Sequence, residues 1–342
     1  MVEPAPISTD PSAATSADED SVAATAGVSH PFQVLALDGG GIKGLFSAAV
    51  LAAIEADLGT VITNHFDLIV GTSTGGIIAL ALGAGIRPRE VVSLYTGMAS
   101  HVFAGARRRA PLRLVRRKFS NAPLRDSLIQ SLRDRALWES LVPLVIPAYD
   151  LTSDQVHLFK TPHHPRLRRD WPLKMVDVAM ATSAAPTYLP SWKVDGVRLV
   201  DGGVWANNPV LVGIAEAVSV FGARLEDVRV LSLGTTEDLV GRHRRLDRGG
   251  LVQWANSAVP VVLRGQSIGA QNIAYHLIGD RLVRIDERVP ANSLRIDRAD
   301  PDALFGLASS LSRQRMPAIE PFSRHTATPL RPFHRPGQEP LP

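Results

Sequence analysis

Gly71-Thr-Ser73-Thr-Gly75 is the stretch of this sequence whose residue types are best suited to covalent chemistry. It matches the pattern G-x-S-x-G and stands between an apolar run typical of a buried strand and one typical of a buried helix. A sharp turn from strand to helix exposes a serine hydroxyl, and small flanking residues avoid clashes in the strained backbone. The positive end of the helix stabilises the negative charge that develops during acyl transfer. We therefore predict that Ser73 is a nucleophile, supported by Gly71 and Gly75.

A serine nucleophile needs a base, and Asp201 is the candidate that the sequence singles out. Asp201-Gly-Gly203 directly follows the strand candidate Val197–Val200, and active-site groups collect at the ends of strands in a parallel sheet. Gly202 permits a tight turn and a close approach of the backbone. A simple surface turn made of aspartate and glycine is the alternative. None of the ten histidines has surroundings that mark it as catalytic.

A second glycine-rich stretch, Gly39-Gly-Gly-Ile-Lys-Gly44, matches G-x-G-x-x-G between a strand and a helix. A dinucleotide site also needs an acidic residue near the end of the next strand, where this chain has Gly71-Thr-Ser73-Thr-Gly75 instead. We therefore expect neither a nicotinamide nor a flavin cofactor. The N–H groups of Gly39, Gly40 and Gly41 suit a phosphate or an oxyanion, and Lys43 adds a positive charge nearby.

Composition excludes several other kinds of chemistry. The 342 residues include no cysteine, which rules out disulfides, thiolate metal sites and cysteine nucleophiles, and no metal-ligand cluster is visible. The net charge is +4, and residues 1–30 hold five acidic residues and no basic one, so the remainder carries +9. A basic body favours anionic partners such as nucleotides or lipid headgroups, and a merely solubilising surface is the alternative. No signal peptide is evident, so we expect a cytoplasmic protein.

Seven basic residues gather between positions 107 and 118, beginning with Arg107, Arg108 and Arg109. The cluster could dock on anionic phospholipid, hold a cyclic dinucleotide through arginine–phosphate pairs, or form a solvated basic loop. A weaker cluster, Arg242, Arg244, Arg245 and Arg248, has the same options. We do not expect nucleic acid as a partner, because no reading module or aromatic platform accompanies the charge.

The elements that must position these residues alternate between strands and helices. Strands are predicted at Phe32–Leu37, Phe66–Val70, Leu141–Tyr149, Gln155–Phe159, Val197–Val200, Val228–Leu233 and Arg281–Ile285. Helices are predicted at Gly44–Leu58, Thr74–Gly83, Pro88–Val102, Pro123–Arg135, Leu173–Thr182, Pro209–Phe221, Leu251–Tyr275 and Pro301–Ser312. This order predicts one α/β domain over residues 31–323 with a mainly parallel sheet. Residues 1–30 are predicted to be a disordered acidic tail and residues 324–342 a proline-rich flexible tail.

Taken in order, Asp38-Gly-Gly-Gly-Ile-Lys-Gly44, Gly71-Thr-Ser73-Thr-Gly75 and Asp201-Gly-Gly203 resemble the three signature motifs of the patatin-like phospholipases. The resemblance covers residues 31–235 and implies a three-layer α/β/α domain without cofactor or metal. It implies that Ser73 and Asp201 form a dyad without histidine, and that the N–H groups of Gly39, Gly40 and Gly41 form the oxyanion hole. Lys43 stands where the family often has arginine. Ser183-Ala-Ala-Pro186 and Asn207-Asn-Pro209 are also similar to family patterns.

The stretches around Asp38 and around His65-Phe-Asp-Leu-Ile-Val-Gly71 further resemble the phospholipase effectors of bacterial cyclic-oligonucleotide anti-phage systems, known as CBASS. That resemblance implies an enzyme switched on by a cyclic dinucleotide, which then acts on membrane phospholipids as a peripheral protein. The alternatives are a constitutive patatin-like lipase or esterase in lipid turnover, and a nucleotide-sensing effector with an idle hydrolase site.

Overall fold

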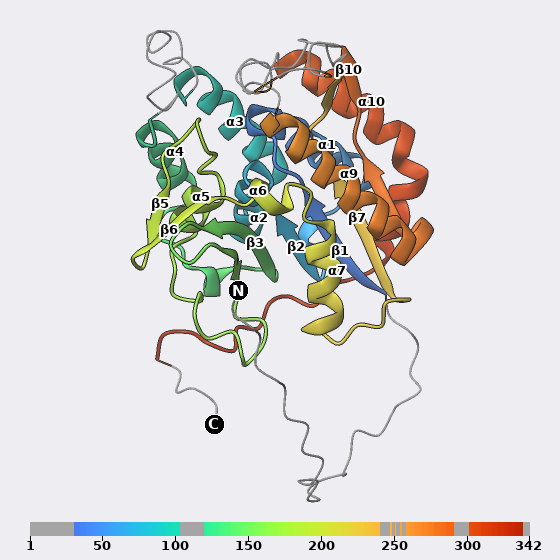
Figure 1. Ribbon diagram of the computed structural model, residues 1–342. Helices are drawn as coiled ribbons and strands as arrows, with labels where there is room; N and C mark the ends of the chain where they lie inside the picture. The colour runs from blue at the N-terminus through green and yellow to red at the C-terminus, as the bar shows by residue number, and fades with distance from the viewer. Residues whose placement is uncertain are drawn as a thin grey trace, which may run out of the picture. The chain divides into compact units, whose positions relative to one another are not determined.

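The computed structural model describes residues 31–102, 120–239, 258–290 and 301–337, together with residues 247, 250 and 254. The strands are β1 (Phe32–Leu37), β2 (Leu68–Gly71), β3 (Leu144–Asp150), β4 (Gln155–Lys160), β5 (Trp192–Val194), β6 (Val197–Asp201), β7 (Val228–Leu233), β8 (Glu237–Leu239), β9 (Leu282–Ile285) and β10 (Arg288–Pro290). The helices are α1 (Gly44–Leu58), α2 (Thr74–Gly83), α3 (Pro88–Val102), α4 (Ala122–Leu132), α5 (Met175–Thr182), α6 (Gly203–Ala206), α7 (Val210–Ser219), α9 (Ala258–Ile278) and α10 (Pro301–Ile319), and Figure 1 shows their arrangement.

Counted over the described residues, eight strands form one sheet in the order β5-β6-β3-β2-β1-β7-β9, with β4 paired to β3. The strands from β3 through β2, β1 and β7 to β9 are parallel. β4 and β6 run antiparallel to β3, and β5 runs antiparallel to β6. The mainly parallel sheet is therefore confirmed, and its parallel part carries Ser73 and the glycine stretch, while the antiparallel part carries Asp201.

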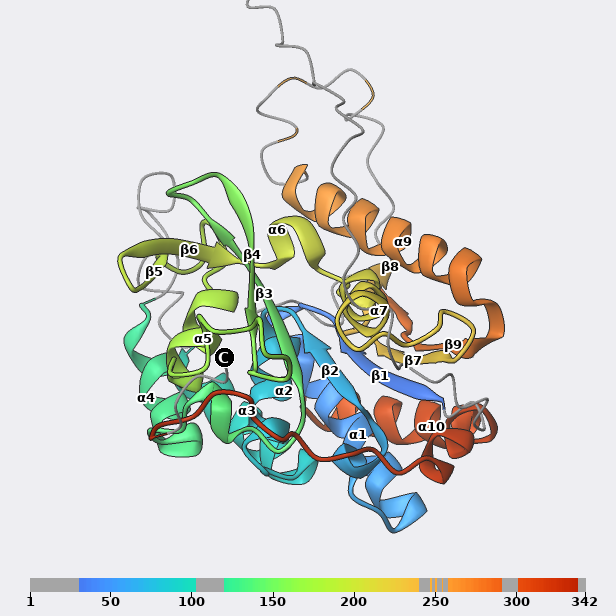
Figure 2. The ribbon, with the colours of Figure 1, turned by 90° about the horizontal axis from the view of Figure 1, so that it is seen from below.

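Alternate residues of each strand pack against opposite layers of helices. In β1, Leu35 and Leu37 belong to a core with α1, α2 and α10, whereas Val34 and Ala36 belong to a core with α7 and α9. Because side chains alternate between the two faces of a strand, a strand covered on both faces is a continuous apolar run. Figure 2 shows α1 and α10 on one side of the sheet and α7 and α9 on the other. The three-layer α/β/α architecture is confirmed.

The predicted elements agree with the structure best near the N-terminus, where β1, α1, α2 and α3 have the predicted bounds. The prediction ended the last helix at Ser312, but α10 continues to Ile319, and β5 was not predicted. None of the described helices is both long and apolar enough to cross a membrane. The stretch Leu68–Ile86 has no charged residue and is long enough to be compared with a membrane span, but it contains β2, the turn at Ser73 and α2.

A 3-10 helix, Glu320–Arg324, follows α10, and the residues beyond it run along the domain as far as the structure describes them. The N–H groups of Ala327, Leu330 and Phe333 donate to the carbonyl oxygens of Asn64, Leu141 and Pro162, at 2.8 to 3.0 Å. The segment predicted to be a flexible tail therefore contacts three separate places on the domain. Residues 1–30, predicted to be a disordered tail, lie outside the described residues.

Candidate active site

Ser73 occupies the sharp turn between β2 and α2 that the sequence predicts. Its backbone has φ 55° and ψ −119°, a conformation that residues with side chains rarely adopt. The flanking glycines are needed for steric reasons. A Cβ on Gly71 would lie 2.2 Å from the carbonyl oxygen of Gly75, and a Cβ on Gly75 would lie 2.2 Å from that of Leu37. The turn can therefore form only where both neighbouring backbones approach without an intervening side chain.

The fold brings Asp201, 128 positions further along the chain, into contact with Ser73. The Ser73 hydroxyl donates to Asp201 Oδ2 at 2.6 Å, and the Gly203 N–H donates to Asp201 Oδ1 at 2.7 Å. Asp201 is the last residue of β6, and both residues are buried, at 6% exposure for Asp201 and 9% for Ser73. A Cβ on Gly202 would lie 2.3 Å from the Pro147 carbonyl oxygen, so this turn also needs glycine.

Burial raises the pKa of Asp201 to about 6, although the hydrogen bonds from Ser73 and from the Gly203 N–H lower it. A carboxylate with such a pKa is mostly ionised at neutral pH and is a stronger base than an exposed aspartate. It is therefore ready to accept a proton from the hydroxyl that donates to it.

Thr182, the last residue of α5, joins the two halves of the site and was not singled out by the sequence analysis. Its hydroxyl accepts the Ser73 N–H at 2.9 Å and donates to the Pro147 carbonyl oxygen at 2.6 Å. Its own carbonyl oxygen accepts the Gly202 N–H at 3.3 Å. The available signal was its place directly before Ser183-Ala-Ala-Pro186, a stretch that the family resemblance had already marked.

The glycine loop, residues 39–44, lies directly against the serine. A Cβ on Gly39 would be 3.2 Å from the Cβ of Ser73. The Gly39 N–H donates to the Asn207 carbonyl oxygen at 3.0 Å, so in this conformation it is already engaged. No turn or loop hydrogen bond of the described residues uses the N–H of Gly40 or Gly41. Lys43 is buried, and its N–H closes the loop on the Gly40 carbonyl oxygen at 3.3 Å.

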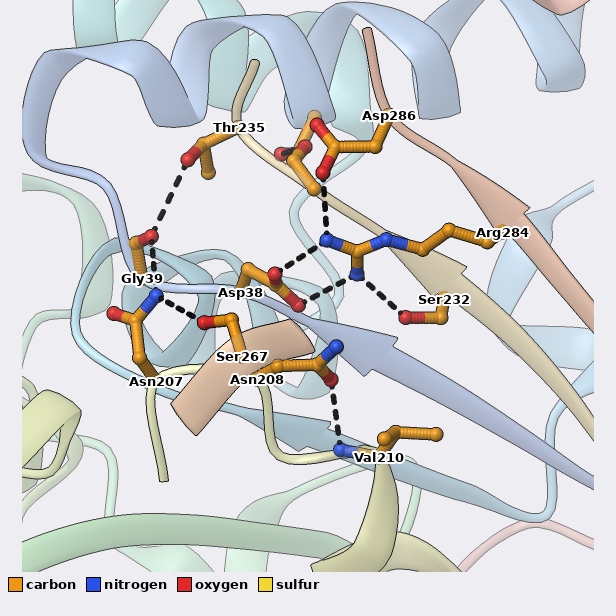
Figure 3. Close-up of polar contacts among 12 residues, drawn as sticks. Asp38, Gly39, Asn207, Asn208, Val210, Ser232, Thr235, Ser267, Arg284 and Asp286 are labelled. Atoms are coloured by element: carbon orange, nitrogen blue, oxygen red, sulfur yellow. Dashed lines mark hydrogen bonds and ion pairs between the residues drawn. The ribbon is translucent and has the colours of Figure 1, made fainter. Parts of the chain in front are cut away.

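Side chains from three other parts of the fold hold this loop, as Figure 3 shows in part. The Thr235 hydroxyl donates to the Gly39 carbonyl oxygen at 3.2 Å. The Asn207 amide donates to the same oxygen at 3.4 Å and to the Ser267 hydroxyl of α9 at 3.1 Å. The Thr74 hydroxyl of α2 donates to the Gly41 carbonyl oxygen at 2.8 Å. The loop is thus tied to the turn after β7, to Asn207 and through it α9, and to the helix that follows Ser73.

Other residues from the sequence analysis are not part of this arrangement. Arg107, Arg108 and Arg109 lie outside the described residues, as does the whole of the second basic cluster. The Trp205 indole, four residues beyond Asp201, donates to the Ala148 carbonyl oxygen at 2.8 Å. Among the histidines that the structure describes, none hydrogen-bonds to Ser73 or Asp201, and buried His163 pairs with Glu216 instead.

The site has a serine at a strained strand-to-helix turn, hydrogen-bonded to a buried aspartate and next to a glycine loop. This geometry is typical of a serine hydrolase in an α/β fold. The family model "Patatin-like phospholipase" matches residues 35–214, which is more than half of the chain. The chain belongs to the patatin-like phospholipase family, as the three motifs indicated.

Relatives of known name extend the similarity over almost the whole chain. A "cGAMP-activated phospholipase" of Pseudomonas aeruginosa is 33% identical and aligns with 90% of this chain and 96% of its own length. A protein of the same name from Vibrio cholerae is also 33% identical, over 86% of this chain and 92% of its own. A "cUMP-AMP-activated phospholipase" of Escherichia coli is 34% identical over 59% of this chain and 64% of its own.

Proposed function

We propose that this chain is a phospholipase that hydrolyses acyl ester bonds of membrane phospholipids and is switched on by a cyclic dinucleotide. The observation that carries the catalytic part is the 2.6 Å hydrogen bond from the Ser73 hydroxyl to buried Asp201. Ser73 is the proposed nucleophile, Asp201 the general base, and the N–H groups of Gly40 and Gly41 the oxyanion donors. Gly39, whose N–H is engaged by Asn207, holds the loop against the serine.

In the first half of the reaction, the Ser73 oxygen attacks the ester carbonyl carbon while Asp201 accepts the hydroxyl proton. The carbonyl oxygen becomes a negatively charged tetrahedral oxyanion, which the N–H groups of Gly40 and Gly41 stabilise. Removing one such donor costs roughly a hundredfold to a thousandfold in rate in other serine hydrolases. When the tetrahedral species collapses, Asp201 returns the proton to the leaving lysophospholipid oxygen, and the acyl group remains on Ser73.

In the second half, Asp201 accepts a proton from a water molecule as that water attacks the acyl ester. The same N–H groups hold the second oxyanion, and its collapse returns the proton to Ser73 and releases the fatty acid. One carboxylate therefore acts as base and then as acid in each half. Its pKa of about 6 suits both directions of transfer near neutral pH.

The activator part of the proposal is supported by the printed names of the relatives, two of which name cGAMP and one cUMP-AMP. The nucleotide therefore differs between relatives that share the family's domain, and the proposal is limited to the class of cyclic dinucleotides. Because the substrate is a membrane lipid, we propose that the active protein associates peripherally with the membrane surface.

The test is fatty-acid release from mixed phospholipid vesicles, measured with cGAMP, with cUMP-AMP and without nucleotide. We expect release with one nucleotide, and loss of at least about a thousandfold in Ser73→Ala and in Asp201→Asn. Ser219→Ala is the matched serine control, because among the described residues its exposed hydroxyl hydrogen-bonds only within its own helix, to the Ala215 carbonyl oxygen. The kcat/KM of the wild type should fall about tenfold per pH unit below about pH 6, where Asp201 is protonated.

Two other results would change the proposal. Equal release without any nucleotide would contradict the activator and leave a constitutive lipid hydrolase. Undiminished release by Ser73→Ala or Asp201→Asn would contradict the assignment of the dyad.

A further inference from the structure

Arg284, on the edge strand β9, reaches across β7 to the residue that precedes the glycine loop. Its Nη1 donates to Asp38 Oδ1 at 2.9 Å and its Nη2 donates to Asp38 Oδ2 at 2.6 Å. Nη1 also donates to the Ser232 hydroxyl at 2.7 Å, and Nη2 to Asp286 Oδ2 at 2.8 Å, as Figure 3 shows. A two-point contact between a guanidinium and a carboxylate fixes the plane and the direction of the carboxylate as well as its distance.

Stability alone does not account for this arrangement. The side chains of Arg284 and Asp38 are 12% and 5% exposed. For such a buried pair, the free energy needed to remove two charges from water often equals the free energy gained from their attraction. In addition, Nε of Arg284 is buried without a hydrogen-bond partner in the described part of the chain. The burial of Arg284 disfavours its charge, but the carboxylates of Asp38 and Asp286 raise its pKa above the ordinary value. The pair therefore stays ionised and keeps its two-point geometry.

Asp38 is the last residue that the sheet itself holds before the glycine loop. Its N–H donates to the Leu233 carbonyl oxygen at 3.0 Å, continuing the pairing of β1 with β7. Three glycines follow, and glycine has the greatest conformational freedom of any residue. N–H donors stabilise an oxyanion effectively only when they are held in place before the reaction. The chain therefore needs an anchor where the ladder of strand hydrogen bonds ends.

The same guanidinium also fixes the turn that covers the loop. Asp286 accepts a hydrogen bond from Nη2 of Arg284 through Oδ2. Its other oxygen, Oδ1, accepts the Thr236 N–H at 3.1 Å. The preceding residue, Thr235, donates to the Gly39 carbonyl oxygen, and a Cβ on Gly40 would lie 2.1 Å from the Thr235 hydroxyl. Arg284 thus holds the glycine loop from two sides, directly through Asp38 and indirectly through Asp286 and the 235–236 turn.

We propose that Arg284 is a positioning residue. Its two-point contact with Asp38 and its contact with Asp286 set the directions of the Gly40 and Gly41 N–H groups. This inference rests on the proposed function, because it takes those N–H groups as the oxyanion donors. It adds to that function a residue more than two hundred positions from the serine, on a strand that contributes nothing else to the site.

The test is the rate at which a fluorophosphonate labels Ser73, measured with cGAMP, with cUMP-AMP and without nucleotide. This reaction needs the same oxyanion donors but neither lipid nor vesicle. Arg284→Lys keeps the positive charge but cannot make the two-point contact with Asp38. In this variant we expect the maximal labelling rate to fall about tenfold or more. The probe concentration for half-maximal rate and the pH midpoint near 6 should not change, because Ser73 and Asp201 are untouched. Arg281→Lys is the matched control, since its guanidinium contacts only the carbonyl oxygens of Ile278 and Leu225.

Unfolding in urea is measured on the same variants, so that a loss of stability is separated from a loss of positioning. Arg284→Lys labelled at the wild-type rate, whatever its stability, would overturn the inference. If that variant does not fold, Asp286→Asn takes its place as the test, and we expect its maximal labelling rate to fall about threefold. A wild-type labelling rate in Asp286→Asn would also overturn the inference. A wild type that labels normally but releases no fatty acid would contradict the proposed function and leave the comparison of labelling rates valid.

Discussion

Asp201→Asn should abolish turnover and at the same time make the folded protein more stable at neutral and alkaline pH. The fold buries this carboxylate and raises its pKa from 3.8 to about 6. A tenfold change in an acid dissociation constant corresponds to about 1.4 kcal/mol, so keeping Asp201 ionised in the fold costs about 3 kcal/mol. An asparagine avoids that cost. Its carbonyl oxygen can accept the Gly203 N–H, and its amide can donate to the Ser73 hydroxyl, so both contacts of the carboxylate are replaced.

The pH dependence of this gain follows from the direction of the pKa change. The folded protein binds the Asp201 proton more tightly than the unfolded chain does, because its pKa is raised. Stability that is present below pH 3.8 is therefore lost as the pH rises through about 6, and it stays lost above that. The advantage of Asp201→Asn should be about 3 kcal/mol at pH 8 and only about 1 kcal/mol at pH 4.5.

The assay is urea unfolding of wild type and variant at these two pH values. Asp126→Asn, which changes an exposed carboxylate on α4, is the control and should change the free energy of unfolding by less than about 0.5 kcal/mol. An Asp201→Asn protein that is less stable than the wild type at pH 8 would refute the burial argument. An equal gain at pH 8 and pH 4.5 would refute the link between that gain and the ionisation of Asp201.

Three further expectations concern two glycines and the C-terminal segment. Gly75→Ala should cost at least about 3 kcal/mol or prevent folding, since its Cβ would lie 2.2 Å from the Leu37 carbonyl oxygen. Gly269→Ala in α9, where a Cβ meets nothing within 4 Å, should instead raise the free energy of unfolding by about 0.5–1 kcal/mol. Removal of residues 325–342 should lower it by about 2–4 kcal/mol, because the segment donates three backbone hydrogen bonds to the domain and buries Ala327. Urea unfolding at pH 8 measures all three, and wild-type stability of the shortened chain would show that the segment contributes nothing.

The first βαβα part of the domain could be predicted almost to the residue, and the reason is local. β1 is an apolar run closed by Asp38 and three glycines, and α2 is an apolar run opened by Ser73. In both places a glycine is required, because an added Cβ would meet the Thr235 side chain at Gly40 and backbone atoms at Gly75. The sequence therefore marks the ends of the elements as well as their interiors. Chemistry and fold restrict the same few positions here, which is why the serine turn and the glycine loop could be predicted together.

The antiparallel part of the sheet was harder to predict, because its pairing depends on distant residues. β5 has three residues and, among the described strands, pairs only with β6. Nothing within Trp192–Val194 distinguishes it from a loop. The prediction that Asp201 is the base depended on a short Asp-Gly-Gly pattern, which simple surface turns also have. What places its carboxylate on Ser73 is the pairing of β6 with β3, at Ala148 opposite Asp201, and that pairing has no signature in the sequence.

The residues that hold the site in shape are less visible in a sequence than the residues that react. A nucleophile or an oxyanion loop needs particular residue types at short spacing, and such patterns can be recognised in one chain. Arg284 needs only to be near Asp38 in space, and within a run of alternating polar and apolar residues it looks like one that faces solvent. Its burial follows from the parallel pairing of β9 with β7 beside β1, which brings the end of β9 to the edge where Asp38 leaves the sheet. Any residue whose role is to position another has this property, so such residues can be found only once the strand order is known.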